Sequence, residues 1–469
     1  MWLDIAVVCL YLAVLAAVGT VGGGRIRKAS DFSAGGGFGT AVLFASLAAS
    51  YIGGGYSAGN AAAAFSGGIG TTLALFGFGV SMILVGRFLV PGASRFAGCT
   101  TVGAVMQRCY GDNARIVTGV FSFLCCLGVV GAQIETMGVT CRVLFGLDET
   151  AGALIGFGVV LLYATGGGLQ AVVRADVLQF ILLASGLPLL LVLSLRQAGG
   201  VEQVLSQLPS GYLDPFAGQG RAGFWCAFLS MACGELLAPP YMQRILSGKS
   251  ARSAARATVY SGCFAFPFFC MTGLLGLAAY VLRVTDTAAH ALPALVMAVL
   301  PQGLRGLVMA AMVSVSLSAA DGFLNSAAVA LVGDVWVPLC RRTPSDGAQL
   351  RLMRLVTVLT GMGAVAAALL LPDVLGILMW AYSFWAPVLP VPLAAALLGV
   401  KASGRCFAAA AAAGLGGCTV WNLLLASRLG IDGTVPGLLC NLAAFAAVLA
   451  VDGRHRGVVH LKNKVVLRK

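Results

Sequence analysis

The sequence predicts an all-α polytopic membrane protein with about 13 transmembrane helices. Hydrophobic residues make up 59% of the 469 residues and charged residues only 10%, whereas a typical soluble domain is about 25% charged. In lipid, only helices and closed barrels satisfy their own backbone polar groups. The apolar runs are about twenty residues long, unlike the roughly ten alternating residues of a barrel strand. This composition excludes a soluble enzyme, a disordered protein and a disulfide scaffold.

Thirteen apolar runs are long enough to cross a membrane. The first, 2–21, has no basic segment before it and is interpreted as a span, not as a cleaved signal peptide. The others are 38–64, 69–91, 116–144, 150–166, 176–196, 222–242, 256–282, 304–336, 354–372, 374–398, 406–427 and 434–452. The shorter run 291–301 is predicted to be an extramembrane or re-entrant helix. We expect one transmembrane domain over 1–452, followed by a basic cytoplasmic tail over 453–469.

The basic residues divide the predicted loops into two classes. With an odd number of spans, the two termini lie on opposite sides of the membrane. Of the 30 Lys and Arg residues, 24 fall on one set of loops and the tail, and six fall on the other set. Because Lys and Arg are enriched on the cytoplasmic side, we expect a cell (inner) membrane protein with its N-terminus outside and its C-terminus inside. The net charge of +13 therefore indicates topology and contact with the bilayer, not a nucleic-acid partner.

Two spans are predicted to be broken near mid-membrane. The second contains three successive glycines, 53–55, which weaken a helix and free its carbonyls. The seventh contains Pro239 and Pro240, which remove N–H donors and clash with the preceding turn. The breaks are five spans apart, as expected for two five-helix repeats in inverted topology, and such matched breaks commonly form a binding site. Other glycines, at 67–68 and 166–168, are interpreted as packing positions.

Acidic side chains at span depth are costly and are functional candidates. They are Glu135, Asp176, Glu235, Asp321 and Asp334. Glu235 lies in the seventh-span break, and Glu135 faces the helix interior beside Gln133. We expect either acid to meet a cationic solute or carry a proton; the alternative is that it serves as an internal partner for an arginine or a backbone donor. Asp334 lies near the cytoplasmic end of its span, and we expect it to pair with Arg341 or Arg342.

Polar groups near the breaks complete the predicted site. Ser314 and Ser318 of the ninth span are four residues apart and share a helix face. Their hydroxyls suit a small hard cation, although serines also bond to the helix backbone. The residues expected to bind solute are Tyr51, Gly54, Tyr56, Gln133, Glu235 and Tyr241.

These motifs resemble the sodium:solute symporter family, which has a leucine-transporter-type fold. The resemblance covers about 30 to 400. Its most specific segments are YATGGGLQAVVRADVLQ at 163–179 and QRILS at 243–247. The segment YIGGGY at 51–56, together with Ala320-Asp321, is most similar to the high-affinity choline transporter branch.

The resemblance implies sodium-coupled symport of a small organic solute into the cell, with Na⁺ as the coupling ion, no cofactor and no enzymatic activity. It implies a sodium site formed by the carbonyls of Ala49, Ile52 and Val315 and the hydroxyl of Ser318. Ala319 stands where the family has a second hydroxyl. In some members a second sodium site uses the acid that matches Asp176.

The choline branch surrounds its cation with aromatic rings. Tyr51 matches one of those positions, whereas Val130 and Ala238 occupy two others. Aromatic residues of the eleventh span either replace them or serve packing at the membrane interface; they are Trp380, Tyr382, Phe384 and Trp385.

Three alternatives remain at the level of sequence: a proton-coupled transporter, a sodium-independent transporter and a transporter-like sensor. Sodium-free uptake would distinguish the first two from sodium symport. Sensors of this type normally carry a large cytoplasmic signalling domain. No sequence feature specifies an oligomeric state.

Overall fold

The computed structural model describes residues 2–23, 28–33, 36–340, 344–370, 374–429 and 432–466. Side chains are described for fewer residues, since those of 18–23, 162–167, 453–466 and a few single helical positions are not included. Across the described residues the chain forms helices and loops, with no β-strand. The all-helical prediction is confirmed.

Eight helical segments are long and apolar enough to cross a membrane, and three bent helix pairs raise the number of candidate spans in the described residues to eleven. Four of the eight segments are single helices: α8 (Asp112–Phe145), α13 (Ala251–Val281), α17 (Asp346–Leu370) and α20 (Gly404–Leu424). Two are parts of longer helices: Gly168–Gln197 of α9 (Glu149–Gln197) and Thr434–Asp452 of α22 (Thr434–Val466). The other two join several elements: α5 (Gly70–Ala74), α6 (Phe76–Leu84), η2 (Val85–Leu89) and η3 (Val90–Phe96), and α15 (Leu304–Val329) with η5 (Ala330–Trp336) and α16 (Val337–Leu339). The multi-pass architecture predicted from the apolar runs is therefore present.

Both predicted breaks are present. The second span divides into α3 (Thr40–Tyr51) and, after a 63° bend, the continuous helix η1 (Gly55–Gly59) and α4 (Asn60–Gly67). The seventh span divides into α11 (Gly220–Gly234) and α12 (Pro239–Leu246), which are bent by 45°. The sequence predicted the positions of both breaks because glycine and proline weaken the backbone hydrogen bonding of the helix in which they occur.

A third span is also broken, which the sequence analysis did not predict. Four residues separate the end of helix α18 (Val374–Trp385) from the start of α19 (Pro390–Leu398), and the two helices are bent by 53°. Pro387 and Pro390 lie at this break, and the same mechanism that breaks the seventh span accounts for it. The local signal was present in the sequence, but the run 374–398 was interpreted as one continuous span.

The fifth and sixth predicted spans form one long helical element, α9, with a kink at Gly168. This glycine has φ 52° and ψ −167°, a backbone conformation open to glycine and rare for other residues. The interpretation of 166–168 as packing glycines is therefore wrong for Gly168, whose role is conformational.

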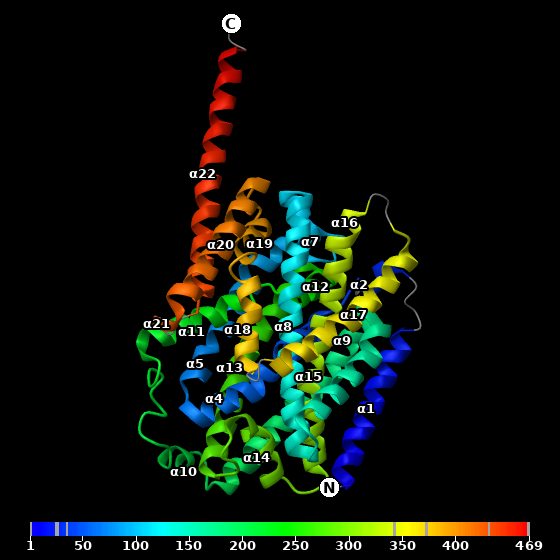
Figure 1. Ribbon diagram of the computed structural model, residues 1–469, viewed down its shortest axis with the longest axis vertical. Coiled ribbons are helices and arrows are strands. Elements are labelled where there is room, and N and C mark those ends of the chain that lie inside the picture. Colours follow the sequence, from blue (N-terminus) through cyan, green and yellow to red (C-terminus); the bar gives the residue numbers. More distant parts are fainter. Residues whose placement is uncertain are drawn as a thin grey trace.

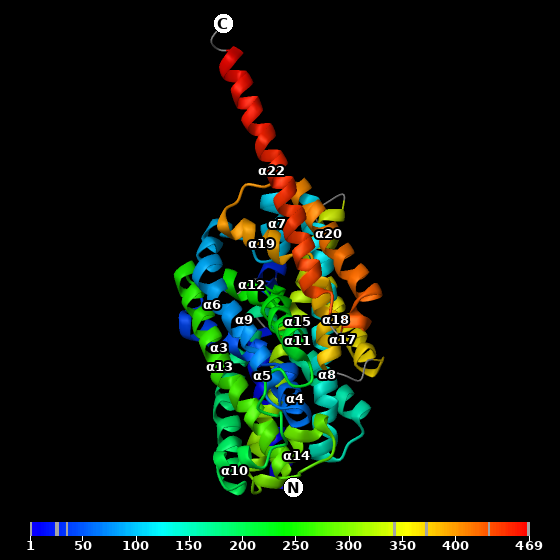
Figure 2. The same cartoon turned by 90° about the vertical axis from the view of Figure 1, so that its left-hand side faces the viewer.

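Short helices lie at both ends of the molecule. Short helices α7 (Val102–Tyr110), α16 and α19 lie at the end from which α22 projects (Figure 1). Helices α10 (Val201–Ser206) and α14 (Ala291–Val299) lie at the opposite end, which also carries the N-terminus, in both views (Figure 2). The predicted short helix near 291–301 is thus α14, and α22 continues beyond the predicted span end at 452.

Helix α15 is the centre of the fold. In its most apolar stretch 94% of the residues are buried, against 28% for the corresponding stretches of α20 and α22. Helix α15 packs against α8, α9 and α1 (Trp2–Gly23), whereas α20 and α22 pair at the periphery. The polar residues of α15 are therefore held inside the protein, where they can contact the broken helices.

Candidate functional site

The first broken helix approaches α8 and α15 through its glycines. The Gly54 N–H donates a hydrogen bond to Gln133 Oε1 at 2.6 Å. A Cβ atom on Gly53 would lie 2.8 Å from Gln133 Oε1 and 3.1 Å from the Cβ atom of Ala319. A Cβ atom on Gly54 would overlap the side chain of Thr136. Glycine is therefore required here because it lets the unwound backbone lie directly against two neighbouring helices.

The second broken helix carries a buried carboxylate, Glu235, between α11 and α12. Glu235 is 4% exposed, and its carboxylate accepts hydrogen bonds from the hydroxyls of Tyr382, at 2.5 Å, and Tyr241. Leu237, in the same gap, has a φ of 56°, which is uncommon for a residue with a side chain. Such a conformation persists only where the surroundings hold it, so the unwound segment that carries Glu235 has a defined shape.

The third broken helix contacts the second one at Glu235. The hydroxyls of Tyr382 and Tyr56 are 3.2 Å apart, which links α18 to the first broken helix as well. The Trp385 indole N–H donates to the carbonyl of Leu236 at 2.8 Å. This bond satisfies a carbonyl that the break removes from the helix. Three broken helices therefore converge on one carboxylate.

Aromatic rings and a small cavity lie beside this carboxylate. The ring of Phe78, on α6, has centroid distances of 4.9 Å to Tyr51, 5.3 Å to Tyr56 and 6.4 Å to Tyr241. The cavity has room for about one water molecule. Its lining includes Ser50, Tyr51, Tyr56, Gln133, Glu235, Ala319 and Phe323.

The structure brings the predicted solute-binding residues together. Tyr51, Tyr56, Gln133 and Glu235 line the cavity, Gly54 is bonded to Gln133, and Tyr241 is bonded to Glu235. Sequence reasoning missed Phe78, whose local signal is an aromatic residue between two glycines. The sequence analysis named Tyr382 among several aromatic residues of the eleventh span, but nothing in the sequence indicated its hydrogen bond to Glu235.

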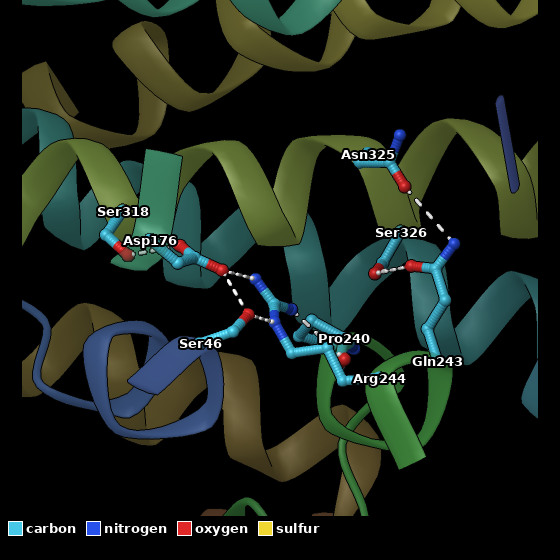
Figure 3. Close-up of polar contacts among 8 residues, drawn as sticks. All are labelled: Ser46, Asp176, Pro240, Gln243, Arg244, Ser318, Asn325 and Ser326. Carbon is cyan, nitrogen blue, oxygen red and sulfur yellow. Dashed lines mark hydrogen bonds and ion pairs between the residues drawn. The ribbon is translucent and has the colours of Figure 1, made fainter. Parts of the chain in front are cut away.

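A second buried polar cluster is centred on Asp176 and Arg244, which are both fully buried (Figure 3). Arg244 Nη2 lies 2.9 Å from Asp176 Oδ2, and Arg244 Nε donates to Ser46 Oγ at 2.7 Å. The Ser46 hydroxyl in turn donates to Asp176, and Ser318 Oγ donates to Asp176 Oδ1 at 2.6 Å. These contacts join α3, α9, α12 and α15 at one point.

The cluster contains two of the predicted sodium-binding residues, Ser318 and Asp176, in direct contact. The three predicted carbonyl ligands belong to buried residues, Ala49, Ile52 and Val315. Ile52 follows the last residue of α3, so it lies at the start of the break. Sequence reasoning counted Arg244 among the basic residues of the cytoplasmic loops and gave it no binding role, whereas the structure buries it inside the protein. The sequence signal for such a role was a basic residue just after a broken span.

The neighbouring residue Gln243 forms a separate set of contacts (Figure 3). Its amide nitrogen donates to Asn325 Oδ1 at 3.2 Å and to the carbonyl of Ser33 at 3.0 Å. Ser326 Oγ donates to Gln243 Oε1 at 2.9 Å. Gln243 and Arg244 together therefore fasten α12 to α15, α9, α3 and the short helix α2 (Ala29–Ser33).

Asp334 has an arginine partner among the described residues, Arg115, which the sequence analysis did not predict. Asp334 Oδ1 lies 3.0 Å from Arg115 Nε and accepts a hydrogen bond from Thr101 Oγ1 at 2.9 Å. The predicted partners, Arg341 and Arg342, lie outside the described residues. Packing of α7 and α8 against η5 brings Arg115 to Asp334, and sequence proximity does not indicate such a contact.

Comparison with known sequences identifies the family. The family model described as the sodium:solute symporter family matches residues 32–417. The chain is 26% identical over 399 residues to the human high affinity choline transporter 1, covering 80% of this chain and 68% of the relative. It is 24% identical over 407 residues to the Caenorhabditis elegans high-affinity choline transporter 1, covering 80% and 69%. The zebrafish (Danio rerio) sodium/glucose cotransporter 4 is 27% identical over 386 residues, covering 71% and 58%.

Solved structures agree on the fold. A substrate-bound, outward-open Na⁺-coupled sialic acid symporter superimposes with a TM-score of 0.83 at 18% identity, covering 96% of this chain and 97% of that chain. A nucleobase-cation-symport-1 family transporter in a closed conformation superimposes with a TM-score of 0.63 at 15% identity, covering 91% of this chain and 96% of that chain. The chain therefore belongs to the sodium:solute symporter family and is a multi-pass membrane protein that couples solute transport to sodium, not an enzyme.

Proposed function

We propose that the protein takes up a small organic cation, such as an ammonium-bearing solute, together with sodium. The observation that carries this proposal is the buried carboxylate of Glu235 at the meeting point of three broken helices. No ion pair involving Glu235 occurs among the described residues. A buried carboxylate is costly without a positive partner, and a cationic solute supplies one.

The surrounding rings support the same solute class. Tyr51, Tyr56 and Tyr241 gather about Phe78 next to the carboxylate. Aromatic faces attract organic cations, most strongly where water is excluded. The solute-binding set proposed here is Tyr51, Gly54, Tyr56, Gln133, Glu235 and Tyr241. The names of two similar proteins, both choline transporters, are consistent with an ammonium solute.

The proposed sodium site lies where α3 unwinds next to α15. Its ligands are the carbonyls of Ala49, Ile52 and Val315 and the hydroxyl oxygen of Ser318. The Ser318 hydroxyl donates its proton to Asp176, which leaves the lone pairs of its oxygen for a cation. Asp176 is the proposed nearby acid, and it acts through this hydrogen bond or as a ligand of a second ion.

Sodium affinity should respond to residues 318 and 319 in opposite directions. Ser318→Ala removes an oxygen ligand and should raise the sodium concentration that gives half-maximal uptake. Ala319→Ser adds a hydroxyl and should lower that concentration; one neutral ligand contributes on the order of 1 kcal/mol, by analogy with a hydrogen bond, or about fivefold. The measurement is sodium-dependent uptake, or sodium-induced thermal stabilisation, of wild type and both variants. Identical sodium dependence in all three would place the ion elsewhere.

A large side chain in the first break should stop transport. Gly54→Leu suits lipid, so membrane insertion should be retained, but the new side chain would overlap Thr136. We expect uptake below a tenth of the wild-type rate, normalised to the folded protein recovered. Gly158→Leu is the matched control, because no atom lies within 4 Å of a Cβ at that glycine. A wild-type rate for Gly54→Leu would show that this segment does not line the site.

The proposed topology has thirteen spans with five-plus-five inverted repeats, one helix before them and two after. Eleven candidate spans come from length and composition; α1 and the part of α9 before Gly168 would be the remaining two. The proposed domain is 1–452, with the tail 453–469 in the cytoplasm and the N-terminus outside a cell (inner) membrane. A cysteine-reactive, membrane-impermeant label on single-cysteine variants at either end tests this orientation.

A further inference from the structure

A cavity of about 210 Å³ lies between α1, α8, α9 and α15, apart from the site at Glu235. It is lined by apolar side chains, two cysteines and one glycine, with Leu12 on α1, Met137 on α8, Ile155 on α9 and Val313 on α15. An engineered apolar cavity of about 150 Å³ in another protein stays dry and binds benzene or xenon. This cavity is larger, and its only side chains that can form hydrogen bonds are two thiols, which are weak donors and acceptors, so a hydrocarbon group is its natural occupant.

The cavity opens onto the surface that faces lipid. Ile155, one of its lining residues, is 52% exposed. Leu147, another lining residue, belongs to the short connection between α8 and α9. The start of α1 and the connection between α8 and α9 lie at the end of the molecule that carries the N-terminus (Figure 1), and the lining residues Ile5 and Leu147 belong to them, so the cavity lies near that end. Trp2, 88% exposed, lies in the first turn of α1, and tryptophan favours the headgroup region.

We propose that this cavity binds one acyl chain of a membrane phospholipid. A phospholipid places its headgroup at the membrane boundary and its chain alongside α1, which is the direction in which the cavity runs. The apolar lining provides no partner for a polar ligand, since a buried polar group without a hydrogen bond is costly. The bilayer supplies phospholipid chains at high concentration next to the opening.

The walls of the cavity are also the walls of the transport site. Val313 and Leu317 line the cavity from α15, and they alternate with Val315 and Ser318 of the proposed sodium site. Met137 of α8 lines the cavity one residue after Thr136, against which Gly54 packs. A bound acyl chain therefore supports the two helices on which the unwound segment of the first broken helix rests.

The test is photocrosslinking of the purified full-length protein, delipidated in detergent, with phosphatidylcholine that carries a diazirine in one acyl chain. Crosslinked peptides are identified by mass spectrometry over a range of probe concentrations at constant detergent concentration. We expect saturable labelling of the segments that contain Met137 or Ile155, with excess unlabelled phosphatidylcholine competing. Labelling of the α20 segment with Val420 and Leu423, which are 54% and 76% exposed, should rise in proportion to the probe.

Two variants on α1 distinguish labelling by a chain bound in the cavity from labelling by lipid at the protein surface. Leu12→Phe fills the cavity from α1 and should lower labelling of the Met137 and Ile155 segments at least fivefold. Leu10→Phe is the matched control, since Leu10 is 66% exposed and does not line the cavity; its labelling should equal that of wild type. Ile5→Phe, another lining position, replaces Leu12→Phe if that variant is not recovered as a monodisperse protein.

The same variants report on stability without any crosslink. Phosphatidylcholine added to delipidated protein should raise its unfolding temperature in wild type and Leu10→Phe, and should do so much less in the filled variant. Labelling at Met137 and Ile155 that rises linearly, or that persists unchanged in both filled variants, would overturn the proposal. So would competition by a free fatty acid but not by phosphatidylcholine.

Discussion

Replacing Glu235 with glutamine should lower solute uptake at least tenfold. The substitution keeps the shape of the side chain and removes its negative charge, so a cationic solute loses its partner in a site that excludes water. A tenfold loss corresponds to about 1.4 kcal/mol in the transition state for transport. The measurement is the initial rate of solute uptake into proteoliposomes that contain equal amounts of folded wild type and variant.

Two further variants separate charge from structure at this position. Tyr382→Phe removes one hydrogen bond to the carboxylate and keeps the ring. It should therefore lower the uptake rate less than Glu235→Gln does, because the charge on the carboxylate remains. Glu135→Gln removes another acid from the membrane region, one that does not line the cavity beside Glu235, and should leave uptake close to wild type. A normal rate per folded molecule for Glu235→Gln, with only a lower yield, would assign Glu235 a structural role.

Removing Asp176 should produce the largest loss of stability. Asp176→Leu leaves Arg244 as a fully buried charge without its carboxylate, and breaking such a pair on one side costs about 3–5 kcal/mol. The loss should appear as a lower unfolding temperature of the purified protein. The double variant Asp176→Leu/Arg244→Met replaces the pair with apolar side chains and should recover much of the lost stability, because neither charge then remains buried.

Equal destabilisation in the single and double variants would contradict this account of the Asp176 cluster. The double variant should nevertheless transport poorly. It also removes the group to which Ser318 donates its proton, and it releases α12 from α3. The double variant should therefore recover stability without recovering transport. If the ion pair had a purely structural role, transport would recover together with stability.

The features that the sequence predicts well are those determined within one helix. Apolar runs locate the spans because each must cross the same thickness of hydrocarbon. The breaks at Gly53–Gly55 and Pro239–Pro240 follow from the backbone chemistry of those residues, and the break near Pro387 has the same cause. Gly168 was misjudged because a run of small residues does not reveal which of them adopts a positive φ.

Contacts between helices were less predictable. Arg244 reaches Asp176 from 68 positions away in the sequence, and Arg115 reaches Asp334 from 219. Tyr382 reaches Glu235 only because α18 is itself broken and its end lies beside the gap between α11 and α12. Such pairings depend on the packing of whole helices, so a single sequence identifies the groups that need partners but not the partners themselves.

The most direct test of the central claim is current measurement on proteoliposomes adsorbed to a solid-supported membrane. A panel of ammonium-bearing, neutral and anionic solutes is applied in sodium and again with potassium replacing sodium at the same pH. The account predicts inward positive current with at least one ammonium-bearing solute, in sodium only, and its loss in Glu235→Gln. Current from neutral or anionic solutes alone, or current that persists in potassium and follows pH, would contradict it.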